Sequence, residues 1–176
     1  MWYVIQTLGG EEEHTADMIR RRVPSYYIEE CFIPKRERMK KFYGQWNKVE
    51  EILFPAYIFV ATDRPGELYQ ELRRVPRLTK VLGREEGYFV ALSEEEESLV
   101  RNLGGHMHRA GLSKVVVGEG KKIRVIEGPL KDYAGDVVKV NLHKREVVVR
   151  VGFMGRETEL RLGIEMVRED KRALKA

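Results

Sequence analysis

The chain has 176 residues, of which 43% are hydrophobic and 34% charged, and its formal net charge is +4. This length allows one ordinary domain or two small ones, and the mixture of both charge signs argues against a disordered chain. No apolar run approaches the ~20 residues of a bilayer-spanning helix, the start lacks the pattern of a signal peptide, and a single cysteine, Cys31, allows no internal disulfide. We therefore expect a cytoplasmic protein with no membrane partner.

The first 50 residues predict strands and one helix. Trp2–Thr7 is aromatic and β-branched, which is typical of a strand. Glu11–Val23 is predicted to be a helix, because acids stand in its first turn and three arginines in its last. An extended stretch over 29–41 and a returning strand over 46–52 are expected to flank a hairpin tip at Tyr43-Gly44-Gln45.

The next segment begins with the most apolar run of the chain, Phe54–Val60, which predicts a buried strand. Asp63 is expected to cap a second helix. Ser93 followed by Glu96 forms a capping box, which predicts the start of a third helix. The mixed order of strands and helices over residues 1–105 predicts an α+β fold, an α/β sandwich with a mostly antiparallel sheet.

The remainder of the chain predicts a second, all-β domain. Residues 106–118 show little periodicity and are expected to form a linker. Over 119–170, short β-rich runs alternate with turn residues, which predicts a small five-stranded β-barrel followed by a tail at 171–176. The strands are expected at 122–126, 136–141, 146–151 and 157–162, with a last short strand ending at Val167.

Basic residues are concentrated in this second part. Residues 1–105 hold 16 basic and 18 acidic residues, whereas residues 106–176 hold 16 and 10, a balance of +6. Such asymmetry favours nucleic acid as the partner of the basic part.

Antiparallel strands place successive turns at opposite ends of the barrel. The RNA-binding cations predicted at one end are Lys121, Lys122, His143, Lys144, Arg145 and Arg161, joined by Arg109 and Lys114 of the linker. A second cluster for RNA or protein contact is predicted at the other end: Lys131, Tyr133, Phe153 and Arg156. The alternative for the turn at 143–145 is a solvated hairpin tip.

Four motifs occur in a fixed order along the chain. They are Trp-Tyr-Val near the start, Phe-Pro-Ala-Tyr-Ile-Phe-Val in the middle, Val-Leu-Gly after the second helix and Ile-Glu-Gly-Pro-Leu-Lys-Asp-Tyr-Ala-Gly in the tail. With these motifs the chain resembles the NusG family of transcription elongation factors over nearly its whole length. The resemblance implies an N-terminal domain that binds a coiled-coil clamp element of RNA polymerase, and a C-terminal KOW domain, a five-stranded barrel of the SH3-like type.

The resemblance also implies which residues meet the polymerase. They are Tyr3, Phe54, Pro55, Tyr57, Leu82 and Gly83. On composition alone, Phe54 and Tyr57 are better explained as core residues.

Within the family, the basic tail is most similar to that of LoaP, an antitermination factor of long biosynthetic operons. This likeness implies binding of an RNA hairpin in the nascent leader transcript and readthrough of terminators. The chain departs from the family at Ala56, where Gly is usual, at Met154 of Met-Gly-Arg, where Phe is usual, and at Lys131. The last two lie in loops that meet a ribosomal protein and a termination helicase in the general factor. A general NusG-type elongation factor with such protein partners is therefore the alternative, and a ribosome-associated RNA-packing protein is a second one.

No pattern indicates catalysis. His106 and His108 lack a nearby third ligand for a metal ion. Gly118-Glu119-Gly120-Lys121 lacks the first glycine and the final Ser or Thr of a phosphate-binding loop. Cys31 alternates into a strand without a neighbouring base, which indicates a buried structural thiol. We expect a monomeric binding protein that is not an enzyme and uses no metal or cofactor.

Overall fold

The computed structural model describes residues 1–76, 78 and 89–168. The chain divides into two compact units that do not follow chain order. Unit 1 comprises Met1–Pro34 and Phe54–Arg101, and unit 2 comprises Lys35–Leu53 and Asn102–Ala176. The segment 35–53, which the sequence placed with the first 105 residues, is thus grouped with the C-terminal part.

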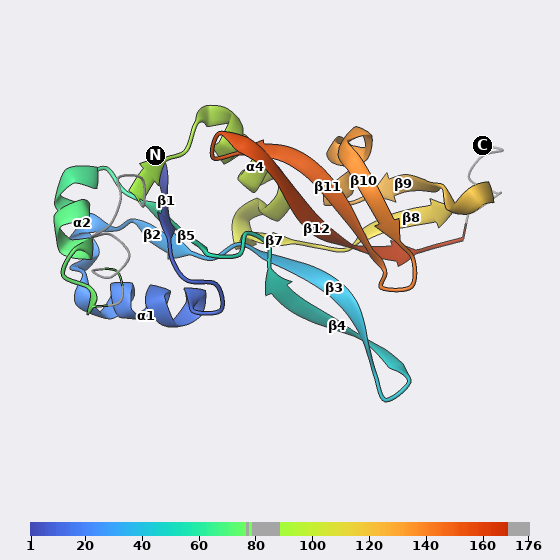
Figure 1. Cartoon of the computed structure of the whole chain (residues 1–176), viewed down its shortest axis with the longest axis horizontal. Coiled ribbons are helices and arrows are strands. Elements are labelled where there is room, and N and C mark those ends of the chain that lie inside the picture. The colour runs from blue at the N-terminus through green and yellow to red at the C-terminus, as the bar shows by residue number, and fades with distance from the viewer. Residues whose placement is uncertain (77, 79–88, 169–176) are drawn as a thin grey trace. The chain divides into compact units, whose positions relative to one another are not determined.

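Unit 1 is built on an antiparallel sheet with the strand order β2-β5-β1-β6 (Figure 1). Its strands are β1 (Trp2–Gln6), β2 (Glu30–Phe32), β5 (Tyr57–Ala61) and β6 (Phe89–Ala91). The helices are α1 (Glu12–Arg22), α2 (Pro65–Leu72) and α4 (Glu94–Gly104), with a 3-10 turn η1 (Ser25–Tyr27). The predicted helix at 11–23 and the buried strand after Phe54 are confirmed.

The α4 start also confirms the predicted capping box. The Ser93 hydroxyl accepts the Glu96 backbone N–H at 3.2 Å, while the Glu96 carboxylate accepts the Ser93 N–H at 3.1 Å. Farther along α4, the Arg101 guanidinium lies 4.1 Å from the centre of the Trp2 ring. Trp2 in turn packs edge-on against Phe32 at 5.0 Å, and Phe32 stacks on Phe59 at 5.5 Å. These aromatic contacts form one part of the core of unit 1.

Unit 2 contains a curled five-stranded sheet with the order β10-β11-β12-β8-β9. Its strands are β8 (Ser113–Val117), β9 (Ile123–Glu127), β10 (Val137–Asn141), β11 (Glu146–Phe153) and β12 (Arg156–Met166). Three 3-10 segments accompany them: η2 (Gly105–Met107), η3 (Glu119–Lys121) and η4 (Pro129–Asp136). This curled half-barrel agrees with the small barrel that the sequence predicts.

Two details of the predicted barrel need correction. The segment 106–118 is not a structureless linker, because its second half forms β8, in which Ser113 and Val115 are fully buried. The predicted strand at 157–162 and the last short strand are one continuous strand, β12. The fifth strand of the sheet therefore comes from the predicted linker and not from the end of the chain.

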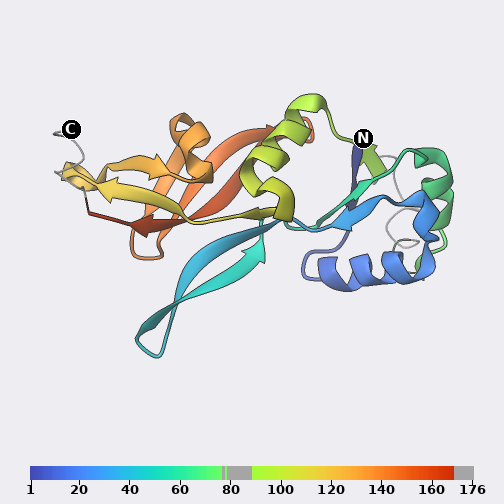
Figure 2. The same cartoon turned by 180° about the vertical axis from the view of Figure 1, so that it is seen from behind.

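The segment 35–53 forms a long hairpin. β3 (Lys35–Phe42) pairs with β4 (Gln45–Ile52), and β3 also pairs with the short β7 (Arg109–Ala110). Tyr43 and Gly44 have φ angles of +49° and +79°, as a tight two-residue hairpin turn requires. The predicted hairpin is confirmed. Figures 1 and 2 show its tip projecting from unit 2.

The body of this hairpin packs against the half-barrel through β3 and β12. Gly163 of β12 permits the close approach, since a Cβ there would lie 2.9 Å from the Arg38 Cα and closer still to the Glu37 carbonyl. Beside this contact, the Arg36 guanidinium donates to Glu146 at 3.1 Å and to Glu51 at 2.6 Å. Arg36 and Glu146 are each 4% exposed. We call these three residues the buried clasp.

Candidate functional site

The predicted polymerase-binding residues of unit 1 have different environments. Phe54 is 1% exposed and packs against Phe59 with ring centres 5.4 Å apart. It is a core residue and presents no side-chain surface to a partner, which corrects its assignment as a contact. Pro55 is exposed and Tyr57 is half-buried. Leu82 and Gly83 lie outside the described residues.

The turn that presents Pro55 is held by backbone hydrogen bonds. Ala56 adopts a φ of +72°, a left-handed conformation that glycine adopts more readily. Its N–H donates to the carboxylate of Glu12 at 3.1 Å, and its carbonyl accepts the Thr7 N–H at 2.8 Å. The same Glu12 oxygen accepts the Gly10 N–H at 2.8 Å. These bonds fix Pro55 at the surface beside the start of β5.

Tyr3 does not share a face of the sheet with Tyr57. The register pairs Tyr57 with Gln6, and side chains alternate between the faces along a strand, so Tyr3 and Tyr57 point to opposite faces. Tyr3 instead stacks on Phe89 at 5.0 Å, and Phe89 stacks on Tyr69 at 6.1 Å. This row of three half-buried rings was missed by the sequence analysis, although the run Phe89-Val90-Ala91 carries a strand signal.

Half of the predicted RNA-binding cations make contacts within unit 2. Arg109 pairs with Glu50 at 2.6 Å, Lys114 with Glu127 at 3.2 Å, and Arg161 with Glu146 at 3.5 Å. Arg145 lies over the Trp46 ring with its guanidinium carbon 3.9 Å from the ring centre. The Arg109 and Lys114 pairs are solvent-exposed, and such pairs contribute little to stability. A phosphate could replace either carboxylate at small cost.

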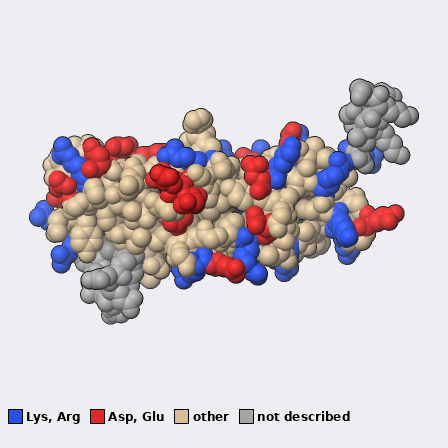
Figure 3. Space-filling model, turned by 90° about the horizontal axis from the view of Figure 1, so that it is seen from above, with Lys and Arg blue, Asp and Glu red and all other residues tan. Residues whose placement is uncertain are grey.

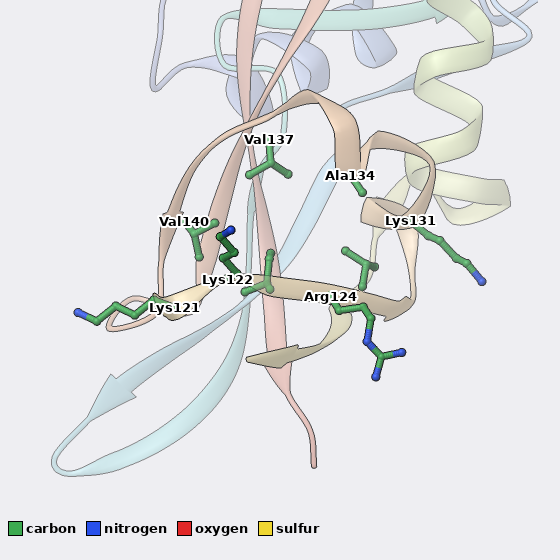
Figure 4. A pocket seen from close by; sticks show the side chains of 9 residues that line it. Lys121, Lys122, Arg124, Lys131, Ala134, Val137 and Val140 are labelled. Atoms are coloured by element: carbon green, nitrogen blue, oxygen red, sulfur yellow. The ribbon is translucent and has the colours of Figure 1, made fainter. Parts of the chain in front are cut away.

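The other four predicted cations, Lys121, Lys122, His143 and Lys144, are exposed, and their side chains have no ion pair among the described residues. Lys121 and Lys122 line an open pocket of 620 Å³ together with Arg124 and Lys131 (Figure 4). The sequence placed Lys131 at the opposite end of the barrel. Figure 4 shows Lys131 beyond the end of β9 and Lys121 before its start, and the two side chains point away from each other.

Arg124 is a cation that the sequence analysis missed. The alternation of Ile-Arg-Val-Ile in β9, with Ile123 and Val125 half-buried and Arg124 exposed, was the signal that could have found it. The pocket therefore gathers four cations from β9, the segment before it and η4. Within this pocket Lys121 and Lys122 stand at the start of β9 and Lys131 beyond its end, so the two predicted clusters stay separate.

The remaining members of the predicted second cluster differ in how far they are buried. Phe153 is 2% exposed and belongs to the core, so its assignment as a contact is corrected. Tyr133 is half-buried; burial raises the pKa of its hydroxyl, a hydrogen bond with Asn102 opposes that shift, and the nearby Asp132 and Asp136 add to it. Arg156 is exposed and follows the Met154–Gly155 turn, whose φ angles are +56° and +74°.

Charged side chains of both signs alternate over the face seen in Figure 3. Among the described residues, no group of three or more His, Cys, Asp or Glu side chains could hold a metal ion. The helices of the described ranges include none long and apolar enough to cross a membrane.

The family model described as transcription termination factor NusG matches residues 1–102. The chain therefore belongs to the NusG family. This membership confirms the family that the four motifs indicate.

Individual relatives agree over nearly the whole chain. The transcription termination/antitermination protein NusG of Vibrio vulnificus is 29% identical over 165 residues, covering 92% of this chain and 91% of its own. The protein of the same name from Thermus thermophilus is 29% identical over 178 residues, covering 94% and 96%. The solved structure of NusG from Thermotoga maritima, which concerns domain interaction in that protein, has 26% identity and a TM-score of 0.55 and covers 92% of both chains.

Proposed function

We propose that this protein is an antitermination factor that binds RNA polymerase with its N-terminal part and nascent RNA with its C-terminal part. In this proposal unit 1 is the polymerase-binding part, predicted over residues 1–105. The half-barrel of β8 to β12 is the KOW domain, predicted over residues 119–170. Membership in the NusG family and the termination/antitermination names of its relatives support the first half of this proposal. In the finer version, the protein is a LoaP-like paralogue that promotes readthrough in long operons after binding a leader hairpin.

For the polymerase, the proposed contact consists of Pro55 and Tyr57 at the start of β5, with Tyr3 as a further contact. A half-buried aromatic side chain next to an exposed proline suits the apolar face of a helical partner, such as a coiled-coil clamp. Tyr3 belongs to the aromatic row with Phe89 and Tyr69, which forms a second apolar strip on the other face of the sheet.

The observation that supports RNA binding most strongly is the group of cations at the pocket beside β9. Lys121, Lys122 and Lys131 have no ion pair among the described residues, so their charges are available to phosphate. Arg109 and Lys114, whose ion pairs are exposed, can exchange a carboxylate for phosphate. Each phosphate contact releases counterions, which makes binding strongly dependent on salt.

The RNA half of the proposal is tested by charge removal in the full-length protein. We expect the double variant Lys121→Gln/Lys122→Gln to bind a leader hairpin more weakly and to lower the slope of log K against log salt by roughly 1.4 to 1.8, or ~0.7 to 0.9 per lost phosphate contact. Filter binding across a salt series measures both quantities. The matched control is Arg73→Gln/Arg74→Gln, which removes two exposed charges from unit 1. Equal losses in both double variants would contradict a specific role for the pocket cations.

The second candidate is a general NusG-type factor whose KOW domain binds a ribosomal protein or a termination factor. It is favoured by the exposed Arg156 and the half-buried Tyr133, which lie in the loops that the family resemblance assigns to such partners. Competition between hairpin RNA and a ribosomal protein for the full-length chain separates the two candidates.

A further inference from the structure

The pocket lined by the four cations lies between the two edges of the five-stranded sheet. β9 and β10 are the terminal strands in the order β10-β11-β12-β8-β9, and each has one strand partner within the described part of the chain. η4 connects these two edge strands and contributes Lys131 and Ala134 to the pocket. Figure 4 shows side chains from all three elements around the pocket.

The lining of this pocket combines an apolar surface with positive charge. Its uncharged members are aliphatic: Ile123, Val125, Ala134, Val137 and Val140. Its charged members are the four cations, and no carboxylate lines the pocket. A ligand that fits such a lining has a flat apolar part and a negative charge beside it. A nucleotide has both, and the volume of 620 Å³ lies within the roughly 300–1,000 Å³ of small-ligand sites.

The strand edges add hydrogen-bonding groups to this lining. The outer backbone N–H and C=O groups of an edge strand have no ladder partner, so they can pair with the edge of a base. They could also pair with a peptide strand. Lysines along an edge oppose strand addition, however, and four cations without an acid disfavour most peptides. The charge therefore favours a polyanion as the occupant.

We propose that this pocket binds a single unpaired nucleotide of an RNA, with its base on the aliphatic surface and an adjacent phosphate on Lys122. Lys121 and Lys131, at opposite ends of β9, would hold phosphates farther along the strand in the two directions. Arg124 lies at the rim, where its planar guanidinium can stack on the base or pair with a phosphate. This inference rests on the proposed RNA binding and adds which part of the RNA is held. It explains how a hairpin is distinguished from a plain duplex.

A paired base cannot enter such a pocket. In an A-form stem the bases are stacked and their major-groove edges are inaccessible to side chains, so recognition by base contact requires a loop, bulge or end. The pocket therefore selects an unstacked nucleotide, while exposed cations outside it, such as Lys144, attract the backbone of any RNA.

The test fills the pocket without touching the core. Ala134 is exposed and lines the pocket, so Ala134→Trp places a ring in the space of the proposed base. The matched control is Val138→Trp, a substitution in β10 at a 45% exposed residue that does not line the pocket. Circular dichroism and thermal melting of both full-length variants confirm that they fold.

The probes are an RNA hairpin with an unpaired loop and a blunt duplex of the same stem. We expect the wild-type protein to bind the hairpin about tenfold more tightly, which is the size of one lost base contact. Ala134→Trp should abolish this preference and leave duplex binding unchanged, and Val138→Trp should keep both. An abasic substitution at one loop position should lower wild-type affinity by the same factor, and 2-aminopurine at that position should change fluorescence on binding.

The outcomes separate this inference from the proposed function. If the wild-type protein retains no RNA at low salt, the proposed RNA binding is wrong. If it binds RNA, but Ala134→Trp keeps the hairpin preference or no abasic position matters, the nucleotide pocket is wrong and RNA binding stands. Loss of a peptide or protein ligand in Ala134→Trp with unchanged RNA binding would also overturn the inference in favour of strand addition.

Discussion

At the scale of single residues, Ala56 stands where glycine is usual in the family, and its backbone conformation is strained. Its φ of +72° is a conformation that costs a residue with a Cβ about 1–2 kcal/mol. Hydrogen bonds to Glu12 and from Thr7 hold it there. The family's usual glycine at this position is thus explained by the backbone, and alanine is tolerated because the surrounding bonds impose the turn.

Replacing Ala56 by glycine should therefore stabilise unit 1. The relief of strain exceeds the entropy that glycine adds to the unfolded chain, so we expect a gain of roughly 0.5 to 1 kcal/mol in the free energy of unfolding. Urea denaturation of the full-length protein measures it. The control is Ala91→Gly, at an exposed strand residue, which should destabilise by a similar amount. A loss of stability in Ala56→Gly would show that the turn is not strained.

Cys31 is the second residue for which the structure predicts a measurable property, the pKa of its thiol. Burial raises the pKa of its thiol to about 11, and Arg20 partly opposes this shift. By its surface exposure the Cys31 side chain is half-buried, so the buried thiol that the strand alternation predicts is only partly enclosed.

The Cys31 thiol should react slowly at pH 8. A pKa of about 11 leaves ~100-fold less thiolate than an ordinary thiol with a pKa near 9, so iodoacetamide labelling should be roughly 100-fold slower than in the urea-unfolded chain. The pKa of the thiol is higher in the folded than in the unfolded protein. Its contribution to the free energy of unfolding is therefore fully present below pH 9 and is lost as the pH rises toward 11. Equal labelling rates in folded and unfolded protein would contradict the assigned burial.

At the scale of elements, the hairpin at 35–53 and the half-barrel are joined by the buried clasp. The sequence predicted the hairpin tip because Tyr43-Gly44 is a local turn signal. It did not predict the clasp, because Arg36 and Glu146 are 110 positions apart and each is an ordinary charged residue in its own strand. It also missed β8, since Ser113–Val117 is short and follows a glycine-containing segment that resembles a linker.

The clasp makes unit 2 sensitive to the loss of one carboxylate. Glu146→Ala removes the buried partner of Arg36 and leaves Glu51, which is farther out, as its remaining carboxylate. Breaking a buried pair costs up to about 3–5 kcal/mol. Chemical denaturation in a Trp2→Phe background, in which Trp46 is the one remaining tryptophan, reports on this unit by its fluorescence. The matched control is Glu159→Ala, whose pair with Arg150 is exposed and should change stability by less than ~1 kcal/mol.

The close approach of β12 to β3 at Gly163 gives a second test of the contact between the hairpin and the half-barrel. Gly163→Ala introduces a Cβ that collides with the backbone of β3, whereas Gly152→Ala meets open space. We expect faster amide exchange in β3 and β12 for the first variant only. Unchanged exchange in Gly163→Ala would mean that the hairpin and the sheet do not pack as described.

At the scale of the whole molecule, the sequence indicated two functions in two regions, and the family match supports the general class. The count of basic and acidic residues along the chain located the basic region, but it could not show which cations already contact carboxylates or aromatic rings. Arg109 and Lys114 face carboxylates and Arg145 lies on Trp46, so formal charge overstates what is available to RNA. Arg124 and the two ends of β9 that carry Lys121 and Lys131 depend on the fold of the half-barrel, which a charge count does not contain.

The central claim is that one chain links polymerase to a structured transcript, and a readthrough assay tests it most directly. Purified polymerase transcribes a terminator template with or without an upstream leader hairpin, in the presence of the full-length protein. The account predicts increased readthrough on the hairpin template alone, and its loss in Lys121→Gln/Lys122→Gln. Equal readthrough on both templates, or none above the protein-free reaction, would contradict it.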